Sequence, residues 1–197
     1  MQYPTTIYNG VTAFLKSHSA EQIAHVKGTL LAHLEGTYAL LHDWGNPIEL
    51  CLAGLCHTVY GTDGFPLKFL DISRRSELRR LIGPKAEEFV YFYASCDRSH
   101  LYPQIENASP VRFRDRFSGS IFAPDDGLFK SFLELSLANE LEIMRADPVL
   151  VEQTRTSFVP LFARCQGLVS DPAFAYFCDI YGMAEPKERL ERMWRLA

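Results

Sequence analysis

Residues 46–60, NPIELCLAGLCHTVY, decide the fold. Asn46 can cap a helix, Pro47 suits its first turn, and Glu49 can reach back in a capping box. The helix expected over 47–59 is apolar on nearly every side, which is typical of a helix at the centre of a domain. A central helix of this kind predicts a bundle in which other helices pack around it.

Helical periodicity continues on both sides of this segment. Further helices are expected at about 7–16, 29–44, 73–81, 85–95, 128–145, 148–168, 172–181 and 185–196. Residues 98–126 hold several prolines and glycines and are expected to form a long loop with little regular structure. With no convincing strand and no repeat, the sequence predicts one all-α domain over 1–197, with its core at roughly 18–145 and C-terminal helices over 148–196.

Composition limits the classes of function. The chain has 197 residues, 47% of them hydrophobic, and a formal net charge of −4, so no strong positive field favours nucleic acid or an anionic membrane. No apolar run reaches the roughly 18–20 residues that cross a bilayer, and the N-terminus lacks the pattern of a signal peptide. The five cysteines contain no C-x-x-C pair, so they are expected to be buried small hydrophobes. These features predict a cytoplasmic protein without a nucleic-acid or membrane partner.

Histidine marks the candidate site. His57 stands near the end of the central helix, where the polar segment TVYGTDG (58–64) begins, and an imidazole in that position can line a pocket. His33 lies on the preceding helix, and a short connection between antiparallel helices can bring the two histidines together. His25 lies eight residues before His33 and could join them.

The order of these features resembles the HD-domain metal phosphohydrolases. The runs that carry the resemblance are LCLAGLCH (50–57), LAGLCHTVYGTDGF (52–65), LRRLIGPKAEEFVYFYASCDR (78–98) and LANELE (137–142). The pattern is most similar to the small-alarmone (p)ppGpp hydrolase branch. The runs HLEGTYALL (33–41) and AGLCHTVYGT (53–62) also resemble an uncharacterised HD-like family that brings no activity with it. The resemblance implies an HD-like helical bundle with a divalent metal such as iron, manganese or zinc.

The sequence departs from that family at its acidic ligands. The resemblance implies His33 and His57 as metal ligands, but Thr58 and Asn139 stand where the family has aspartates. Neutral oxygens do not supply the charge that holds a divalent cation and acidifies its water. His25 or Asp63 could complete a replacement site. Glu140, next to Asn139, is expected to face elsewhere, because one residue turns a helix by about 100°.

The same residues could also form a pocket without a metal. His57 can act as general acid or base, because its ordinary pKa is about 6.5. Tyr60 can donate to a substrate oxygen, and Arg98 can bind a carboxylate or phosphate. The further residues expected to bind ligand are Tyr38, Thr58, Thr62, Asp97 and Asn139.

Two hypotheses of different class follow. In the first, the chain is a diverged HD-fold enzyme, hydrolase-like or similar to metal-dependent oxidases, that acts on a small anionic metabolite with His33 and His57 as ligands or acid/base groups. In the second, it is a binding or regulatory protein that keeps the fold and the pocket without chemistry. The C-terminal segment 185–196 is expected to pack on the core or on a second copy in a homodimer.

Overall fold

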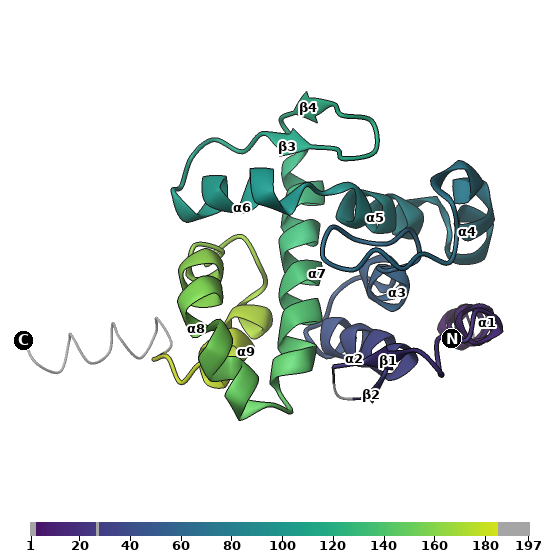
Figure 1. The fold of residues 1–197 in the computed structure, drawn as a ribbon, viewed down its shortest axis with the longest axis horizontal. Helices are drawn as coiled ribbons and strands as arrows, with labels where there is room; N and C mark the ends of the chain where they lie inside the picture. The colour runs from purple at the N-terminus through teal and green to yellow at the C-terminus, as the bar shows by residue number, and fades with distance from the viewer. Residues whose placement is uncertain (1–2, 27, 185–197) are drawn as a thin grey trace, which may run out of the picture.

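The computed structural model describes residues 3–26 and 28–184, and this part of the chain is mainly helical (Figure 1). The helices are α1 (Tyr3–Ser17), α2 (Leu30–Asp43), α3 (Ile48–Cys56), the 3-10 turn η1 (Ile72–Arg74), α4 (Arg75–Ile82), α5 (Pro84–Ser95), α6 (Arg98–Glu106), α7 (Asp126–Met144), α8 (Pro148–Ala163) and α9 (Asp171–Ile180). Two antiparallel hairpins pair β1 (Ala24–His25) with β2 (Gly28–Thr29), and β3 (Phe113–Arg114) with β4 (Ile121–Phe122). The all-α prediction is confirmed as a mainly helical fold.

Helix α7 organises the molecule. It runs through the middle of Figure 1, with α2, α3 and α5 on one side and α8 and α9 on the other. Its N-terminus is fixed by Asp125, whose carboxylate accepts hydrogen bonds from the backbone of Gly127 and Leu128. One cluster of buried hydrophobic side chains extends from α1 to α9. Side chains on α7 therefore face both halves of the bundle.

Helix α3 is buried as predicted, and it ends earlier than predicted. All of its residues from Leu50 to Cys56 are buried, and a Cβ on Gly54 would lie 2.6 Å from Leu41 Cδ1, so a glycine there lets α2 and α3 approach closely. The helix stops at Cys56 rather than at position 59, because the chain turns through tight backbone bonds from Val59 N to Cys56 O and from Gly61 N to Thr58 O. His57 is thus the residue at which the central helix ends.

The prediction of a long irregular loop over 98–126 was wrong. Asp97 caps a new helix, α6, by accepting a hydrogen bond from the backbone of His100 at 2.9 Å. The β3–β4 hairpin follows, and it is tied to the end of α5 by a backbone bond from Arg116 N to Ser95 O at 2.8 Å. The prolines and glycines of this segment therefore do not indicate a structureless loop: most lie between short elements, and Pro103 lies inside α6.

Smaller differences concern the ends of elements. The β1–β2 hairpin was not expected, and α8 ends at Ala163 instead of continuing to about 168. The C-terminal helix predicted at 185–196, with its proposed role in a dimer, lies outside the described residues. All five cysteines are buried, as expected. No helix in residues 3–26 and 28–184 is long and apolar enough to cross a membrane.

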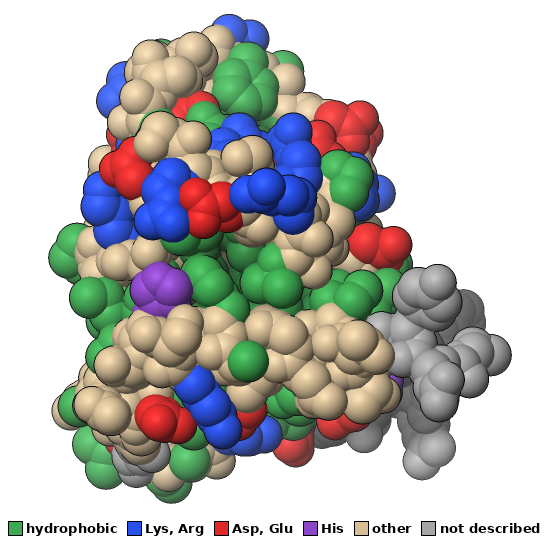
Figure 2. Space-filling view, turned by 90° about the vertical axis from the view of Figure 1, so that its right-hand side faces the viewer, with side chains coloured by type: hydrophobic (Ala, Val, Ile, Leu, Met, Phe, Trp, Pro, Cys, Tyr) green, Lys and Arg blue, Asp and Glu red, His purple; other side chains and the backbone are tan. Residues whose placement is uncertain are grey.

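Basic and acidic side chains are interspersed on the face that carries α1 and α4 (Figure 2). Beneath that face, the buried carboxylate of Glu87 accepts hydrogen bonds from Arg75 Nε at 2.6 Å, Arg75 Nη2 at 2.9 Å and Arg79 Nη2 at 3.0 Å. The Tyr60 hydroxyl donates to the same carboxylate at 3.0 Å. Arg74 pairs in turn with Glu77. Arg74, Arg75 and Arg79 thus have carboxylate partners in the chain itself.

Candidate functional site

A cavity of about 420 Å³ lies among α2, α3, α5, α6, α7 and α8. His25, His33 and His57 line it together, so the three histidines that the sequence singled out do meet. The His33 ring is stacked on His25 with ring centres 4.3 Å apart, and it meets His57 edge-on at 5.3 Å. The volume is within the usual range for sites of small molecules.

His57 is held as a neutral hydrogen-bond acceptor. It is only 2% exposed, and burial together with the neighbouring His33 lowers its pKa to about 3. Its Nδ1 lies 2.7 Å from the carbonyl oxygen of Gly54, which can only accept, so Nδ1 carries the hydrogen. The lone pair is therefore on Nε2, which is left to meet whatever occupies the cavity.

His33 is engaged at both ring nitrogens. Nδ1 lies 2.6 Å from Glu142 Oε2, and Nε2 lies 3.0 Å from Asn139 Oδ1. The amide of Asn139 is oriented in turn, because its Nδ2 donates to Glu140 Oε1 at 3.1 Å. A Cβ on Gly36 would lie 2.5 Å from Glu142 Oε1, so the glycine in HLEGTYALL leaves the room that this carboxylate occupies. A continuous polar chain thus joins α2 to α7.

The residues present do not fit the divalent metal that the resemblance implies. Among the described residues, no group of three or more His, Cys, Asp or Glu side chains is placed to hold a metal ion. Both nitrogens of His33 are occupied by hydrogen bonds, and Asp63 accepts from the backbone of Arg98 at 3.0 Å. Thr58 and Asn139 line the cavity with neutral oxygens. This donor set is suited to hydrogen bonding rather than to metal coordination.

Arg98 brings a positive charge to the cavity. It is the first residue of α6, and its guanidinium lies over the Tyr93 ring, 4.8 Å from the ring centre, while Nε donates to Tyr102 Oη at 3.1 Å. Its Nη1 is withdrawn from solvent and has no hydrogen-bond partner in the described part of the chain. Within the same residues, no carboxylate lies within ion-pair distance of Arg98. An arginine in this position can bind an anion that enters the cavity.

Thr58 offers a second unsatisfied group. The residue is 4% exposed, and Oγ1 has no hydrogen-bond partner among residues 3–26 and 28–184. The turn that presents it is rigid: Thr62 and Phe65 exchange backbone hydrogen bonds, and Arg116 Nη2 donates to Gly61 O at 3.1 Å. Four buried side-chain atoms of the described residues lack a partner, and two of them, on Thr58 and Arg98, belong to residues that line this cavity.

Glu140 is a site residue that sequence reasoning missed. It lines the cavity beside Asn139, because Asn139 points toward His33 on α2 while the longer Glu140 reaches the cavity from the next position. Burial raises the pKa of its carboxyl group, and the charge of Arg98 opposes that shift. The available signal was that Glu140 stands beside Asn139 in the run LANEL (137–141). The expectation that it faces elsewhere was wrong.

Three residues expected at the site have other roles in the structure. The hydroxyl of Tyr60 donates to Glu87, away from the cavity. Tyr38 packs edge-on against Tyr8 with ring centres 4.9 Å apart. Asp97 caps α6 and pairs with Arg114 at 3.4 Å. Besides the expected His25, His33, His57, Thr58, Thr62, Arg98 and Asn139, the cavity is lined by residues that were not expected, namely Val26, Gly64, Phe65, Tyr93, Tyr102, Glu140, Ile143 and Phe158.

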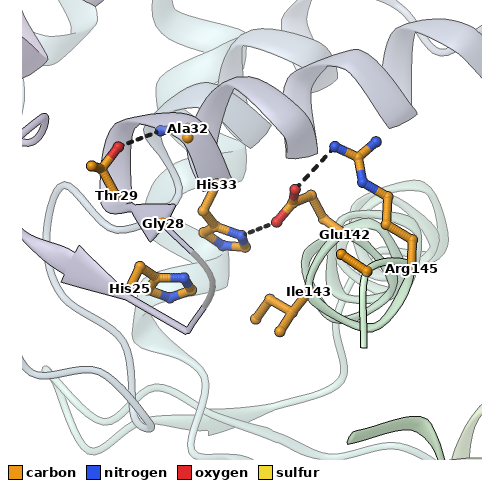
Figure 3. Close-up of a pocket in the computed structure, with 9 residues that line it drawn as sticks. His25, Gly28, Thr29, Ala32, His33, Glu142, Ile143 and Arg145 are labelled. Atoms are coloured by element: carbon orange, nitrogen blue, oxygen red, sulfur yellow. Dashed lines mark hydrogen bonds and ion pairs between the residues drawn. The ribbon is translucent and has the colours of Figure 1, made fainter. Parts of the chain in front are cut away.

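A second, smaller cavity of about 230 Å³ adjoins the first (Figure 3). The two share His25, His33 and Ile143 in their linings. Figure 3 shows His33 with His25 on one side and Glu142 on the other, and Glu142 also accepts from Arg145 at 3.2 Å. The stacked pair of His25 and His33 is thus a wall common to both cavities.

The comparisons with known proteins leave the activity open. Residues 14–98 match the model of a family described as a domain of unknown function, DUF6817. The matched segment contains the three histidines of the cavity, together with Thr58 and Arg98. No curated protein matches this chain, and no solved structure does.

Proposed function

We propose that this chain binds a small anionic metabolite in the histidine cavity and acts on it as an acid–base enzyme built on a diverged HD-like bundle. The observation that carries the proposal is Arg98, which lines the cavity and whose Nη1 is buried without a partner in the described chain. A buried donor of a charged group is costly to leave unsatisfied, and an anionic ligand would satisfy it.

The HD-like part of the proposal is supported by the positions of three residues. His33 on α2, Thr58 just after α3, and Asn139 on α7 occupy the places at which the resemblance puts the metal ligands, and all three line one cavity. The three positions lie around one cavity, and two of them, Thr58 and Asn139, carry neutral side chains in place of the family's aspartates. A site of this kind favours chemistry carried by the chain's own groups.

Two groups in the cavity are suited to proton transfer. Burial lowers the pKa of His57 to about 3 and raises the pKa of Glu140, so the histidine is a neutral acceptor and the glutamate tends to hold its proton. Opposite shifts of neighbouring groups are a common way to assign a base and an acid at one pH. We therefore assign His57 Nε2 as the proton acceptor and the Glu140 carboxyl as the donor.

A binding or regulatory role without chemistry is the second candidate. It is favoured by His33, because both of its ring nitrogens are already engaged by Glu142 and Asn139. A histidine fixed in this way supports the shape of the pocket and does not itself take part in proton transfer.

The first experiment is a thermal-shift screen of carboxylate and phosphate metabolites against three proteins. These are the wild type, Arg98→Met, and Arg80→Met, in which an exposed arginine outside the cavity is changed in the same way. Anions are expected to stabilise the wild type and Arg80→Met and to leave Arg98→Met unchanged. Equal stabilisation of all three proteins, or of none, would contradict the proposal.

Each anion that stabilises the wild type is then incubated with it, and products are sought by mass spectrometry. Turnover that is lost in His57→Gln, with the helical circular dichroism signal intact, supports the enzyme. A ligand that stabilises the protein in an Arg98-dependent way and is never converted decides for the binding role.

A further inference from the structure

We infer that the ligand of the histidine cavity is a hydroxy-carboxylic acid, a single carboxylate with a neighbouring hydroxyl group and an apolar body. This inference rests on the proposed function and narrows its ligand class. It follows from the hydrogen-bonding groups, the charge and the apolar surface that the cavity offers.

The unpartnered hydrogen-bond donors of residues that line the cavity require an acceptor on the ligand. Arg98 Nη1 and Thr58 Oγ1 both lack partners within the described residues, and both belong to residues that line the cavity. The guanidinium is already oriented by the hydrogen bond of its Nε to Tyr102 and by its position over Tyr93. A carboxylate, with two oxygens that each accept hydrogen bonds, suits a fixed arginine and a nearby hydroxyl.

His57 requires a hydrogen-bond donor on the ligand. Because its Nδ1 donates to Gly54 O at 2.7 Å, Nε2 can only accept. A ligand that carries acceptor oxygens alone would set lone pair against lone pair at this atom. The ligand therefore brings a hydrogen of its own, and a hydroxyl group is the simplest source. One molecule thus has to present an anion to Arg98 and a donor to His57.

The charge of the cavity matches one negative charge. Arg98 contributes one positive charge, and its permanent protonation is independent of the surroundings. No carboxylate in the described part of the chain lies within ion-pair distance of it. A monoanion neutralises such a site, whereas a phosphate dianion leaves an uncompensated buried charge.

Part of the remaining lining is apolar. Phe65, Ile143 and Phe158 reach the cavity from the turn after α3, from α7 and from α8, and the Tyr93 ring adds an aromatic face. A volume of about 420 Å³ exceeds what a carboxylate and a hydroxyl fill. The ligand therefore carries an aromatic or branched aliphatic body beside its polar end.

Matched probes test each element of the inference by calorimetric titration. Mandelate has the carboxylate, the hydroxyl and an aromatic body; phenylacetate lacks the hydroxyl, mandelamide lacks the charge, and phenyl phosphate replaces the carboxylate. The pair of 2-hydroxy-4-methylpentanoate and 4-methylpentanoate repeats the hydroxyl comparison with an aliphatic body. At least one hydroxy acid is expected to bind about five- to tenfold more tightly than its deoxy partner, the worth of one hydrogen bond. Mandelamide and phenyl phosphate are expected to bind more weakly than mandelate.

Variants then locate the effect. In Arg98→Met, affinity for both acids is expected to fall about 10- to 100-fold, as for a lost charged hydrogen bond. In His57→Phe the advantage of the hydroxy acid over its deoxy partner is expected to disappear, which a purely structural role would not cause. If that variant fails to fold, the comparison of each hydroxy acid with its deoxy partner on the wild type still tests the inference.

The outcomes separate this inference from the proposed function. If neither hydroxy acid binds better than its deoxy partner, the inference is overturned. If phenyl phosphate binds best and Arg98→Met abolishes its binding, the anion site stands and the hydroxy-acid class is wrong. If no probe binds in a way that depends on Arg98, both the inference and the proposed function are contradicted.

Discussion

Two partly buried ionic regions of this molecule differ in how completely the chain satisfies them. Around Glu87, the carboxylate receives hydrogen bonds from Arg75, Arg79 and Tyr60, and the carboxylate itself is fully buried. Around Arg98, the guanidinium has Tyr102 and the Tyr93 ring as neighbours, and Nη1 stays unpaired within the described residues. Glu87 sits in a closed cluster, whereas Arg98 borders a cavity of about 420 Å³.

The difference separates a structural charge from a functional one. A saturated buried charge fixes the packing of its neighbours, and removal of either partner leaves the other without compensation. An unsatisfied charge next to a cavity stabilises the fold little, and it can gain its missing contacts only from outside the chain. We therefore expect changes at Glu87 to act on stability and changes at Arg98 to act on binding.

The largest effect on stability is expected for Glu87→Gln. The amide keeps one acceptor oxygen and presents a donor to Arg75 and Arg79, so at least one arginine loses its partner. Both arginines are partly exposed and can turn to water, which places the loss in unfolding free energy at about 2–3 kcal/mol. Urea denaturation measures it. An unchanged unfolding free energy would contradict the structural role assigned to Glu87.

Acid is expected to weaken the fold through His57. Its pKa in the folded state, about 3, lies below the ordinary value of 6.5. Between these two pH values His57 is protonated in the unfolded chain and neutral in the folded chain. Stability is therefore fully present above about pH 6.5 and is lost as the pH falls toward 3.

In His57→Gln this contribution is absent. Between about pH 6.5 and pH 5 the wild type is expected to lose about 1.5 kcal/mol more than the variant. Urea denaturation at both pH values measures the difference, in which the parallel contribution of His25 cancels. Equal losses in the two proteins would show that His57 is not held neutral.

Thr58→Val tests whether an unsatisfied group of a residue that lines the cavity lowers the stability of the free protein. Valine has nearly the shape of threonine and removes a buried hydroxyl that has no partner in the described chain. The free protein is expected to gain about 1 kcal/mol of unfolding free energy, because the cost of the unsatisfied hydroxyl disappears. Thermal and urea unfolding measure the gain. A loss of stability would mean that the hydroxyl is satisfied in the free protein.

The smallest effect is expected for Arg80→Met. Arg80 is exposed on α4 and lines neither cavity. Its replacement is expected to change the unfolding free energy by less than about 0.5 kcal/mol, as for other surface charges. The same urea titration provides the value. A larger change would disqualify it as the matched control for Arg98→Met.

The helices other than α6 could be predicted from the sequence because each depends on local signals. Apolar periodicity lies within the elements that it defines, and the Asp125 cap of α7 directly precedes its helix. The expected cap at Asn46 was wrong, because Pro47 holds the N-cap position of α3 and Asn46 Nδ2 donates to Leu41 O and Glu134 Oε1.

The hairpin within residues 98–126 was missed because its contacts join distant segments, such as the backbone bond between Arg116 and Ser95. Helix α6 was missed because Pro103, which usually ends a helix, lies inside it. Local patterns therefore predicted the elements and failed where long-range pairing decides.

The candidate site was predictable in part for the same reason. The spacing of His33 and His57 on neighbouring helices indicated that they meet, and the structure brings them together with His25 and Arg98. Tyr60 does not line the cavity: its hydroxyl donates to Glu87, whereas Thr58, two residues earlier in the same turn, lines the cavity. Glu140 was missed because a helix that crosses the cavity can present two adjacent residues to it.

The most direct test of the central claim compares the unfolding free energy and ligand affinity of Arg98→Met with those of the wild type, with mandelate as the first probe. Without ligand, the variant is expected to stay within about 1 kcal/mol of the wild type, since methionine replaces a charge that the chain does not saturate. With ligand, only the wild type and Arg80→Met are expected to be stabilised. A variant that unfolds without ligand, or that still binds the anion as tightly as the wild type, would contradict the account.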